Sequence, residues 1–152
     1  MAKMSALEAQ SGAPAGDAAQ TRLAPTELLV CISCRSASAP PDLAPDARRP
    51  GDLLLAALHN STLPEGVTLH PVECLSNCDR GCTVALRGGA RWTYIYGNLD
   101  PGVHLEALLD GVARYHATPD GLVTWRDRPV HFRKNCIARI PPAIPPQESQ
   151  NV

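Results

Sequence analysis

The stretch Val72-Glu-Cys74-Leu-Ser-Asn-Cys78-Asp-Arg-Gly-Cys82-Thr-Val-Ala-Leu86 carries three cysteines between two short apolar runs. A second pair, Cys31 and Cys34, follows the apolar run 28–32. Thiolates from two separate loops can surround one inorganic centre, whereas neighbours on a single segment cannot. Free cysteines that serve only as small buried hydrophobes would not fall into two tight groups. The cysteine pattern therefore favours a metal or cluster site.

The patterns on either side of these cysteines predict a small α/β sandwich. Strands are expected at 28–32, 67–72, 83–86 and 91–96, and Gly88-Gly89 between the last two is typical of a hairpin turn. Helices are expected at 51–61 and from Asp100-Pro101 to about residue 112, with an acidic N-cap and a proline in the first turn. The prediction is one small mixed four-stranded sheet, two main helices and a C-terminal arm over 121–140 without an assigned element.

Composition divides the 152 residues into three parts. Residues 1–26 read as a disordered leader, 27–140 as one metal- or cluster-binding domain, and 141–152 as a Pro-rich disordered tail. The formal net charge of −1 argues against a protein that coats nucleic acid. The longest apolar run, 53–58, is too short to cross a membrane, and no signal peptide is visible. The expected location is cytoplasmic, where thiols stay reduced.

Cysteine spacing excludes several familiar sites and leaves two open. The plant-type and bacterial ferredoxin spacings are absent, and no histidine pair indicates a Rieske centre. A zinc ribbon would need the Cys-x2-Cys spacing twice. Cys31 and Cys34 alone would suit a redox dithiol, but the residues after Cys34 make a poor helix start. Four thiolates suit either a tetrahedral Zn²⁺ site or a [2Fe-2S] cluster.

At the level of motifs, the stretch 72–86 resembles the Cys-Leu-Gly-x-Cys-x-x-Gly-Pro-x-Val segment of thioredoxin-like [2Fe-2S] ferredoxins. The chain from about 28 to 142 resembles more closely a bacterial family of predicted metal-binding proteins, a domain of unknown function. That family shares Val-Cys-x-x-Cys-Arg, Cys-Leu-x-x-Cys-x-Arg-Gly-Cys and Trp-Thr-Tyr-x-x-Gly-x-Leu. Its later motifs stand here at 120–129 and 137–142.

This resemblance implies a thioredoxin-like ferredoxin fold in which two loops hold a cluster or metal. The ligands it implies are Cys31, Cys34, Cys74 and Cys78, with Cys82 in reserve and Cys136 a bystander. Two departures stand out. Only two residues separate Cys31 from Cys34, fewer than is usual in those ferredoxins, and Cys82 replaces the proline of their Gly-Pro.

Three further residues are expected around the ligands. Arg35 directly follows Cys34, and Arg80 lies two residues after Cys78. A cation at either position would stabilise thiolates and raise a cluster's potential. The alternative is that both are solvated surface arginines. Gly81 is expected to permit a close backbone approach or a positive φ. His70, four residues before Cys74, is better interpreted as structural than as a ligand.

The resulting functional prediction is a [2Fe-2S] ferredoxin-like electron carrier rather than an enzyme. Genes of the family often lie near those for cobalamin synthesis or metal handling, which implies a link to cobalt metabolism. The alternative is a Zn²⁺- or Co²⁺-binding protein for storage, sensing or delivery that uses the same cysteines, and a dithiol oxidoreductase is a third class. We expect a redox or metal-handling protein partner, no nucleic acid and no membrane, and the sequence is compatible with a homodimer. Residues 114–140 carry six basic and two acidic side chains, which would suit either an acidic partner or a plain soluble face.

Overall fold

The structure, a computed structural model, describes residues 22–36 and 39–143. Apart from 22–26 and 141–143, the predicted leader and tail lie outside the described residues. One five-stranded mixed sheet has the order β2-β1-β3-β4-β5. Its strands are β1 (Thr26–Cys31), β2 (Val67–Val72), β3 (Val84–Arg87), β4 (Thr93–Tyr96) and β5 (Cys136–Ile140). β1 and β2 run parallel, and the other three neighbouring pairs are antiparallel.

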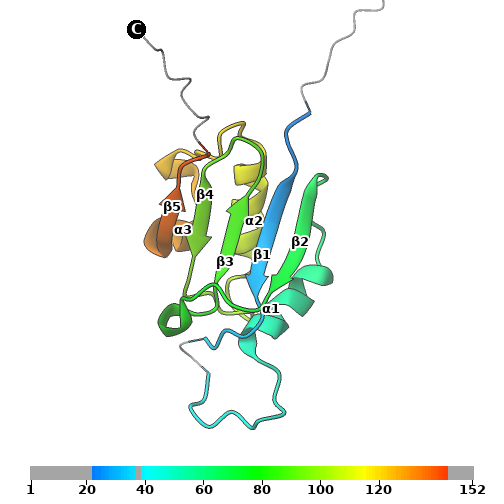
Figure 1. The fold of residues 1–152 in the computed structure, drawn as a ribbon, viewed down its shortest axis with the longest axis vertical. Coiled ribbons are helices and arrows are strands. Elements are labelled where there is room, and N and C mark those ends of the chain that lie inside the picture. The colour runs from blue at the N-terminus through cyan, green and yellow to red at the C-terminus, as the bar shows by residue number, and fades with distance from the viewer. Residues whose placement is uncertain (1–21, 37–38, 144–152) are drawn as a thin grey trace, which may run out of the picture.

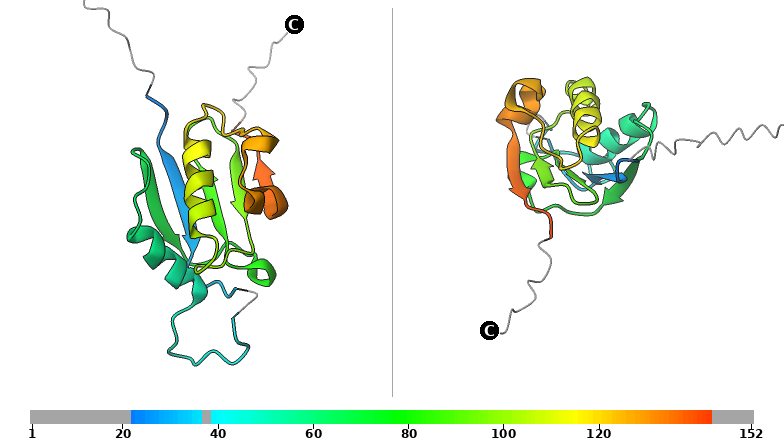
Figure 2. Two further views of the ribbon diagram at one scale, coloured as in Figure 1. Left: turned by 180° about the vertical axis from the view of Figure 1, so that it is seen from behind. Right: turned by 90° about the horizontal axis from the view of Figure 1, so that it is seen from above.

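The helices form a second layer on one face of this sheet. They are α1 (Pro50–His59), α2 (Leu105–His116) and the short α3 (Val130–Lys134), with 3-10 turns η1 (Cys78–Arg80) and η2 (Trp125–Asp127). All three α-helices lie on the same side of the sheet, with α2 between the other two (Figure 2). The predicted α/β class, one sheet with helices packed on it, is confirmed.

The core lies between the sheet and the helices. Side chains alternate across each strand, so Leu28 and Val30 of β1 face the helix layer. Leu28 lies opposite Leu86, which in turn lies opposite Tyr94 of β4. Leu108 and Val112, one turn apart on α2, belong to the same core cluster as these strand residues. All of these side chains are buried. Burial of these apolar surfaces holds the helix layer on the sheet.

The structure corrects the predicted elements in the second half of the chain. The C-terminal arm supplies both α3 and a fifth strand, β5, where four strands were predicted. Helix α2 begins at Leu105 instead of Asp100, because residues 100–104 close on themselves as a turn. In that turn the Asp100 carbonyl accepts from the backbone N–H of His104 (2.9 Å), and the Asp100 carboxylate accepts from that of Gly102 (2.8 Å).

The strand directions bring four chain segments to one edge of the sheet. β1, β2 and β4 all end at this edge and β3 begins there, because β1 and β2 are parallel and each of β3 and β4 reverses its neighbour. It is the lower edge in Figure 1. The turn after β1 and the loop from β2 to β3, which carry five cysteines between them, are therefore neighbours.

Candidate thiol site

Cys31 and Cys34 form a close pair at the end of β1. Each side chain is only 2 % exposed, and the two thiols hydrogen bond to each other. The start of α1 packs directly on this turn, since the Gly51 N–H donates to the Cys34 carbonyl (3.2 Å). A Cβ on Gly51 would lie 2.0 Å from the Cys31 carbonyl oxygen, so only glycine fits there.

The loop between β2 and β3 lies against this pair. The Cys31 thiol donates to the Glu73 carbonyl (Sγ–O 3.6 Å), to which the Ser33 hydroxyl also donates. The Ile32 N–H donates to the Val72 carbonyl (2.9 Å), which extends the pairing of β1 with β2 by one residue. These contacts place the start of the second cysteine group beside the first, as the sequence pattern requires.

Cys74 and Cys78, in contrast, have exposed side chains. Cys74 Sγ accepts from the backbone N–H of Ser76 at 3.2 Å, and Cys78 begins η1. A cleft lined by residues 32, 33, 49, 73 and 74 opens between the two cysteine segments. One half of the site is therefore buried and the other half is accessible from solvent.

Cys82, near the end of the same loop, is buried. Its backbone exchanges two hydrogen bonds with Leu99, at 3.0 and 3.1 Å, so the chain after β4 holds it in place. Gly81, directly before it, has φ −70°. A Cβ on Gly81 would lie 2.3 Å from the Arg35 carbonyl oxygen and 3.2 Å from Cys34 Cβ. Of the two roles expected for Gly81, the structure shows the close approach and not the positive φ.

Burial and hydrogen bonding separate the acidities of the three buried thiols. Burial acts to raise the pKa of Cys31, but hydrogen bonds from Cys34, Ser33 and the backbone of Leu75 and Ser33 outweigh it and lower that pKa. Burial, together with the bond to Cys31, raises the pKa of Cys34 to about 11. Burial and the nearby Cys34, Asp100 and Cys31 raise the pKa of Cys82 to about 12. Within this group, Cys31 is the thiol best prepared to carry negative charge.

The donor chemistry fits a thiophilic metal or an iron–sulfur cluster, but the sulfur atoms do not yet surround one. Among residues 22–36 and 39–143, no three Cys, His, Asp or Glu side chains stand around a common point that could hold a metal ion. Cys31 and Cys34 are in contact, while Cys74 and Cys78 are exposed on the adjoining loop. A four-thiolate site would need the sulfur atoms of both segments to come together around one point.

The other predicted residues take separate places. Arg35 and Arg80 are exposed on the two cysteine segments. His70 contacts the Thr68 hydroxyl (3.0 Å) and the Glu27 carboxylate (3.7 Å) on β1 and β2, which agrees with its structural interpretation. Cys136 lies on β5 opposite Tyr96. The positions of these residues neither assign a metal ligand nor exclude one.

Sequence reasoning missed the residues that connect the two loops through polar contacts. Thr83 hydrogen bonds to the Cys34 thiol, and the Asn77 side chain donates to the Thr83 hydroxyl (3.1 Å). Ser33 and the backbone at Glu73 complete the link to Cys31. The available signal was a small polar residue beside three of the five cysteines: Ser33 before Cys34, Asn77 before Cys78 and Thr83 after Cys82.

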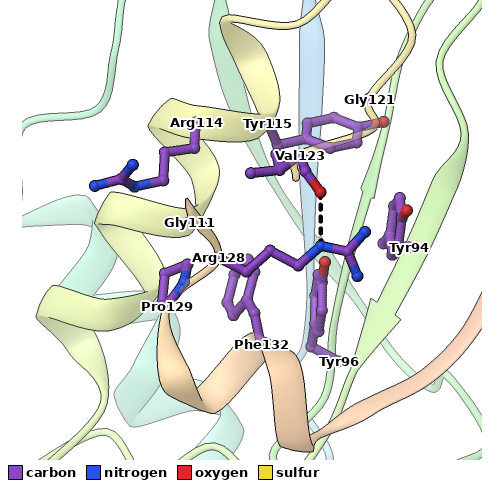
Figure 3. Close-up of a pocket in the computed structure, with 10 residues that line it drawn as sticks. All are labelled: Tyr94, Tyr96, Gly111, Arg114, Tyr115, Gly121, Val123, Arg128, Pro129 and Phe132. Atoms are coloured by element: carbon purple, nitrogen blue, oxygen red, sulfur yellow. Dashed lines mark hydrogen bonds between the residues drawn. The ribbon is translucent and has the colours of Figure 1, made fainter. Parts of the chain in front are cut away.

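A second cavity, between α2, β4 and the C-terminal arm, is too small to be a ligand site. It is lined by residues that include Tyr94, Tyr115, Arg128 and Phe132 (Figure 3). Its volume is about 10 Å³, room for one water molecule at most. The Tyr94 hydroxyl is buried there without a hydrogen-bond partner in the described part of the chain. A single water molecule in the cavity would give this hydroxyl a hydrogen-bond partner.

The fold and this site define a small α/β protein with a group of free cysteines at one edge of its sheet. The chain belongs to the family described as "Protein of unknown function (DUF1636)", whose model matches residues 28–142. No curated protein matches the chain. No helix of the described residues is long and apolar enough to span a membrane.

Two solved structures, both from Aquifex aeolicus, are similar to the chain. One is a thioredoxin-like [2Fe-2S] ferredoxin with 17% identity and a TM-score of 0.48, covering 79% of this chain and 97% of that one. The other is the wild-type thioredoxin-like [2Fe-2S] ferredoxin at 1.5 Å resolution, with 18% identity, a TM-score of 0.45 and coverage of 75% and 97%. At this level of similarity, neither structure indicates what the present chain binds.

Proposed function

We propose that this protein binds a [2Fe-2S] cluster through Cys31, Cys34, Cys74 and Cys78 and carries single electrons. The observation that supports the proposal is the contact of the Cys31 thiol with the carbonyl of Glu73, the residue before Cys74 (3.6 Å). It brings the buried pair of one loop to the start of the other. Four thiolates on two adjacent loops are a donor set that such a cluster requires.

The chain's own residues supply the environment for the thiolates. When bound, the cluster provides a one-electron redox couple. Burial of Cys31 and Cys34 keeps water from that side of the site, and the backbone N–H groups of Ser33 and Leu75 donate towards Cys31. Such donors stabilise negative charge on sulfur and raise a cluster's potential. Arg35 and Arg80 would add positive charge at the rim.

Cys82 is the reserve ligand in this proposal. It is buried within electrostatic range of Cys31 and Cys34, and its pKa, about 12, keeps it protonated at neutral pH. We therefore place it beside the site as a neutral thiol, and as the fourth ligand only if Cys31 or Cys34 points away from the cluster.

The second candidate is a Zn²⁺- or Co²⁺-handling protein that uses the same thiolates. The observation that favours it is the exposure of Cys74 and Cys78, because an accessible half-site suits an ion that is taken up and passed on. Thiolates bind all of these metals, so the ligand set alone does not choose between them.

Metal analysis under anaerobic conditions tests the proposal. The protein is reconstituted with ferrous iron and sulfide, desalted, and characterised by iron and sulfide content, absorption and electron paramagnetic resonance after reduction. We expect equal iron and acid-labile sulfide and a signal from a reduced paired-iron centre. One zinc or cobalt per chain with no sulfide would support the second candidate. A metal-free protein that reduces insulin disulfides would instead assign the Cys31–Cys34 pair to dithiol chemistry.

Two serine variants separate ligation from general damage. Cys74→Ser removes a proposed ligand from an exposed position, where the fold should tolerate it, and is expected to lose the cluster. Cys136→Ser, on β5, is the matched control and should load as the wild type does. A Cys74→Ser protein with full iron content, or an empty Cys136→Ser protein that is still folded, would contradict the ligand assignment.

A further inference from the structure

We propose that a basic and aromatic surface at the opposite end of the sheet from the cysteines is a docking site for an acidic protein. This surface, the Arg/Trp patch, consists of Trp92, Trp125, Arg126, Arg128 and Arg139. β4 ends at the cysteine edge, so Trp92, just before β4, lies at the other end. η2, which carries Trp125 and Arg126, lies beside the end of β5 there (Figures 1 and 2).

Aromatic rings hold two of the guanidinium groups in place. Arg128 Cζ lies 5.6 Å from the centre of the Tyr94 ring and 5.8 Å from that of Trp125, and its Nε donates to the Val123 carbonyl at 2.8 Å (Figure 3). Arg139 Cζ lies 5.0 Å from the centre of the Trp92 ring. Arg139 is exposed, so its stacked guanidinium keeps a hydrogen-bonding edge for carboxylates and loses little side-chain freedom on binding. Arg128 is half-buried and lines the small cavity described above, so its part in the patch is to contact the Trp125 ring.

Within the described part of the chain, no arginine of the patch forms an ion pair, although Asp127 of η2 lies between Arg126 and Arg128 in the sequence. The ion pairs there involve Arg48, His70, Arg87 and Arg114. Residues 114–140 hold six basic and two acidic side chains, a balance of +4, while residues 1–113 hold eight and twelve, a balance of −4. Of these six basic residues, Arg114 is paired with Asp110 and Lys134 lies near the start of β5 at the cysteine edge. The positive charge at the patch itself comes from Arg126, Arg128 and Arg139, and it would attract a negatively charged partner to this end of the sheet.

Exposed apolar side chains accompany these charges and favour a protein as the partner. Of seven large exposed hydrophobic residues in the described chain, four fall between 122 and 140: Leu122, Trp125, Val130 and Ile140. Trp125 is 59 % exposed, and both tryptophans of the chain belong to the patch. Trp and Arg are the residues that most often dominate binding energy at protein interfaces. A net charge of −1 disfavours nucleic acid.

The two tryptophans provide a direct readout. We would titrate the full chain with a synthetic peptide rich in Glu and Leu and follow tryptophan fluorescence, with the same peptide carrying Gln for Glu as the control ligand. We expect saturable binding of the Glu peptide only, weakened by added salt. The double variant Arg126→Ala/Arg139→Ala should weaken binding about tenfold or more. Arg48→Ala/Arg49→Ala, which removes the same charge from exposed positions at the cysteine end, should bind as the wild type does.

Three results would overturn the proposal. The first is that the Glu peptide does not bind, and the second is that the two double variants bind it equally well. The third is that the protein binds a double-stranded DNA oligonucleotide, or phosphatidylcholine vesicles containing phosphatidylserine, more tightly than the peptide. The patch is remote from the thiols, so Cys74→Ser should bind the peptide normally. That measurement makes failure of the patch distinguishable from failure of the cluster proposal.

Discussion

Gly81 lies against Arg35 so closely that a Cβ on Gly81 would come within 2.3 Å of the Arg35 carbonyl oxygen. This approach presses the loop that carries Cys78 and Cys82 onto the turn that carries Cys34. Since the obstacle is backbone and not a flexible side chain, it cannot simply rotate away. The distance between the two thiol-bearing segments therefore depends on a residue without a side chain.

Gly81→Ala should destabilise the protein by about 1–3 kcal/mol, the usual range for an overpacked site, and should reduce iron loading because the two loops separate. Urea unfolding and iron analysis measure the two effects. The matched control is Gly102→Ala, whose Cβ would meet only the Asp100 carboxylate oxygen, at 3.3 Å. Wild-type stability in Gly81→Ala would show that the loops are not held by this contact.

The thiols of the reduced, metal-free protein should be alkylated by iodoacetamide in a definite order. Cys74 and Cys78 react first because they are exposed. Cys31 follows, since it is buried but its pKa is lowered by its hydrogen bonds. Cys34 and Cys82 react last, because they are buried and have pKa values of about 11 and about 12. Peptide mapping by mass spectrometry gives the order, and early modification of Cys82 would contradict it.

Stability should fall as the pH drops below about 6.5, the ordinary pKa of histidine. Burial lowers the pKa of His131, and the neighbouring His104 ring lowers it further, against a hydrogen bond to the Gly97 carbonyl. The unfolded chain therefore binds a proton at this site more readily than the folded one, so the stabilisation is complete above pH 6.5 and is lost as pH falls towards the folded pKa.

Urea midpoints at pH 7.5 and pH 5 measure this loss in the wild type and in His131→Gln. The variant should lose less stability on acidification than the wild type does. His59→Gln, at an exposed position, controls for the removal of a histidine as such. An unchanged pH dependence in His131→Gln would exclude His131 as the cause.

Phe132 anchors the C-terminal arm to the body of the domain. Its ring stacks on Tyr96 with centroids 3.8 Å apart, and it is buried against Gly111 of α2. Phe132→Ala should cost about 3–5 kcal/mol, measured by thermal or urea unfolding. Val130→Ala, exposed on the same helix, should change stability by less than about 0.5 kcal/mol. Similar losses in both variants would mean that the arm is not anchored by burial of Phe132.

The elements that the sequence predicts well are those with strong apolar patterns. The runs at 28–32 and 83–86 are buried central strands, and Gly88-Gly89 does connect antiparallel strands. β5 has no such pattern, because an edge strand buries little and residues 138–140 are exposed. α3 has only five residues, too few for a helical period to show. The start of α2 was misplaced because Asp100 and Pro101 suit a turn as well as a helix start.

The sequence predicted that the two cysteine segments lie side by side, but not which of their thiols are buried. Strand order follows from apolar runs and turn signals, and it brings the cysteine segments to one edge. Which thiols are buried depends instead on the packing of α1 and of the chain after β4, through Gly51 and Leu99. No local pattern near the cysteines carries that information, so the contrast between Cys34 and the exposed Cys74 required the structure.

The central claim is that one inorganic centre takes sulfur ligands from both loops. The most direct test is the iron and acid-labile sulfide content of anaerobically purified Cys31→Ser and Cys74→Ser proteins, one variant from each loop, beside the wild type. We predict equal iron and sulfide, about two of each per chain, in the wild type, and loss of both in either variant. Full iron and sulfide in either variant, or a wild type that holds no iron after reconstitution, would contradict the claim.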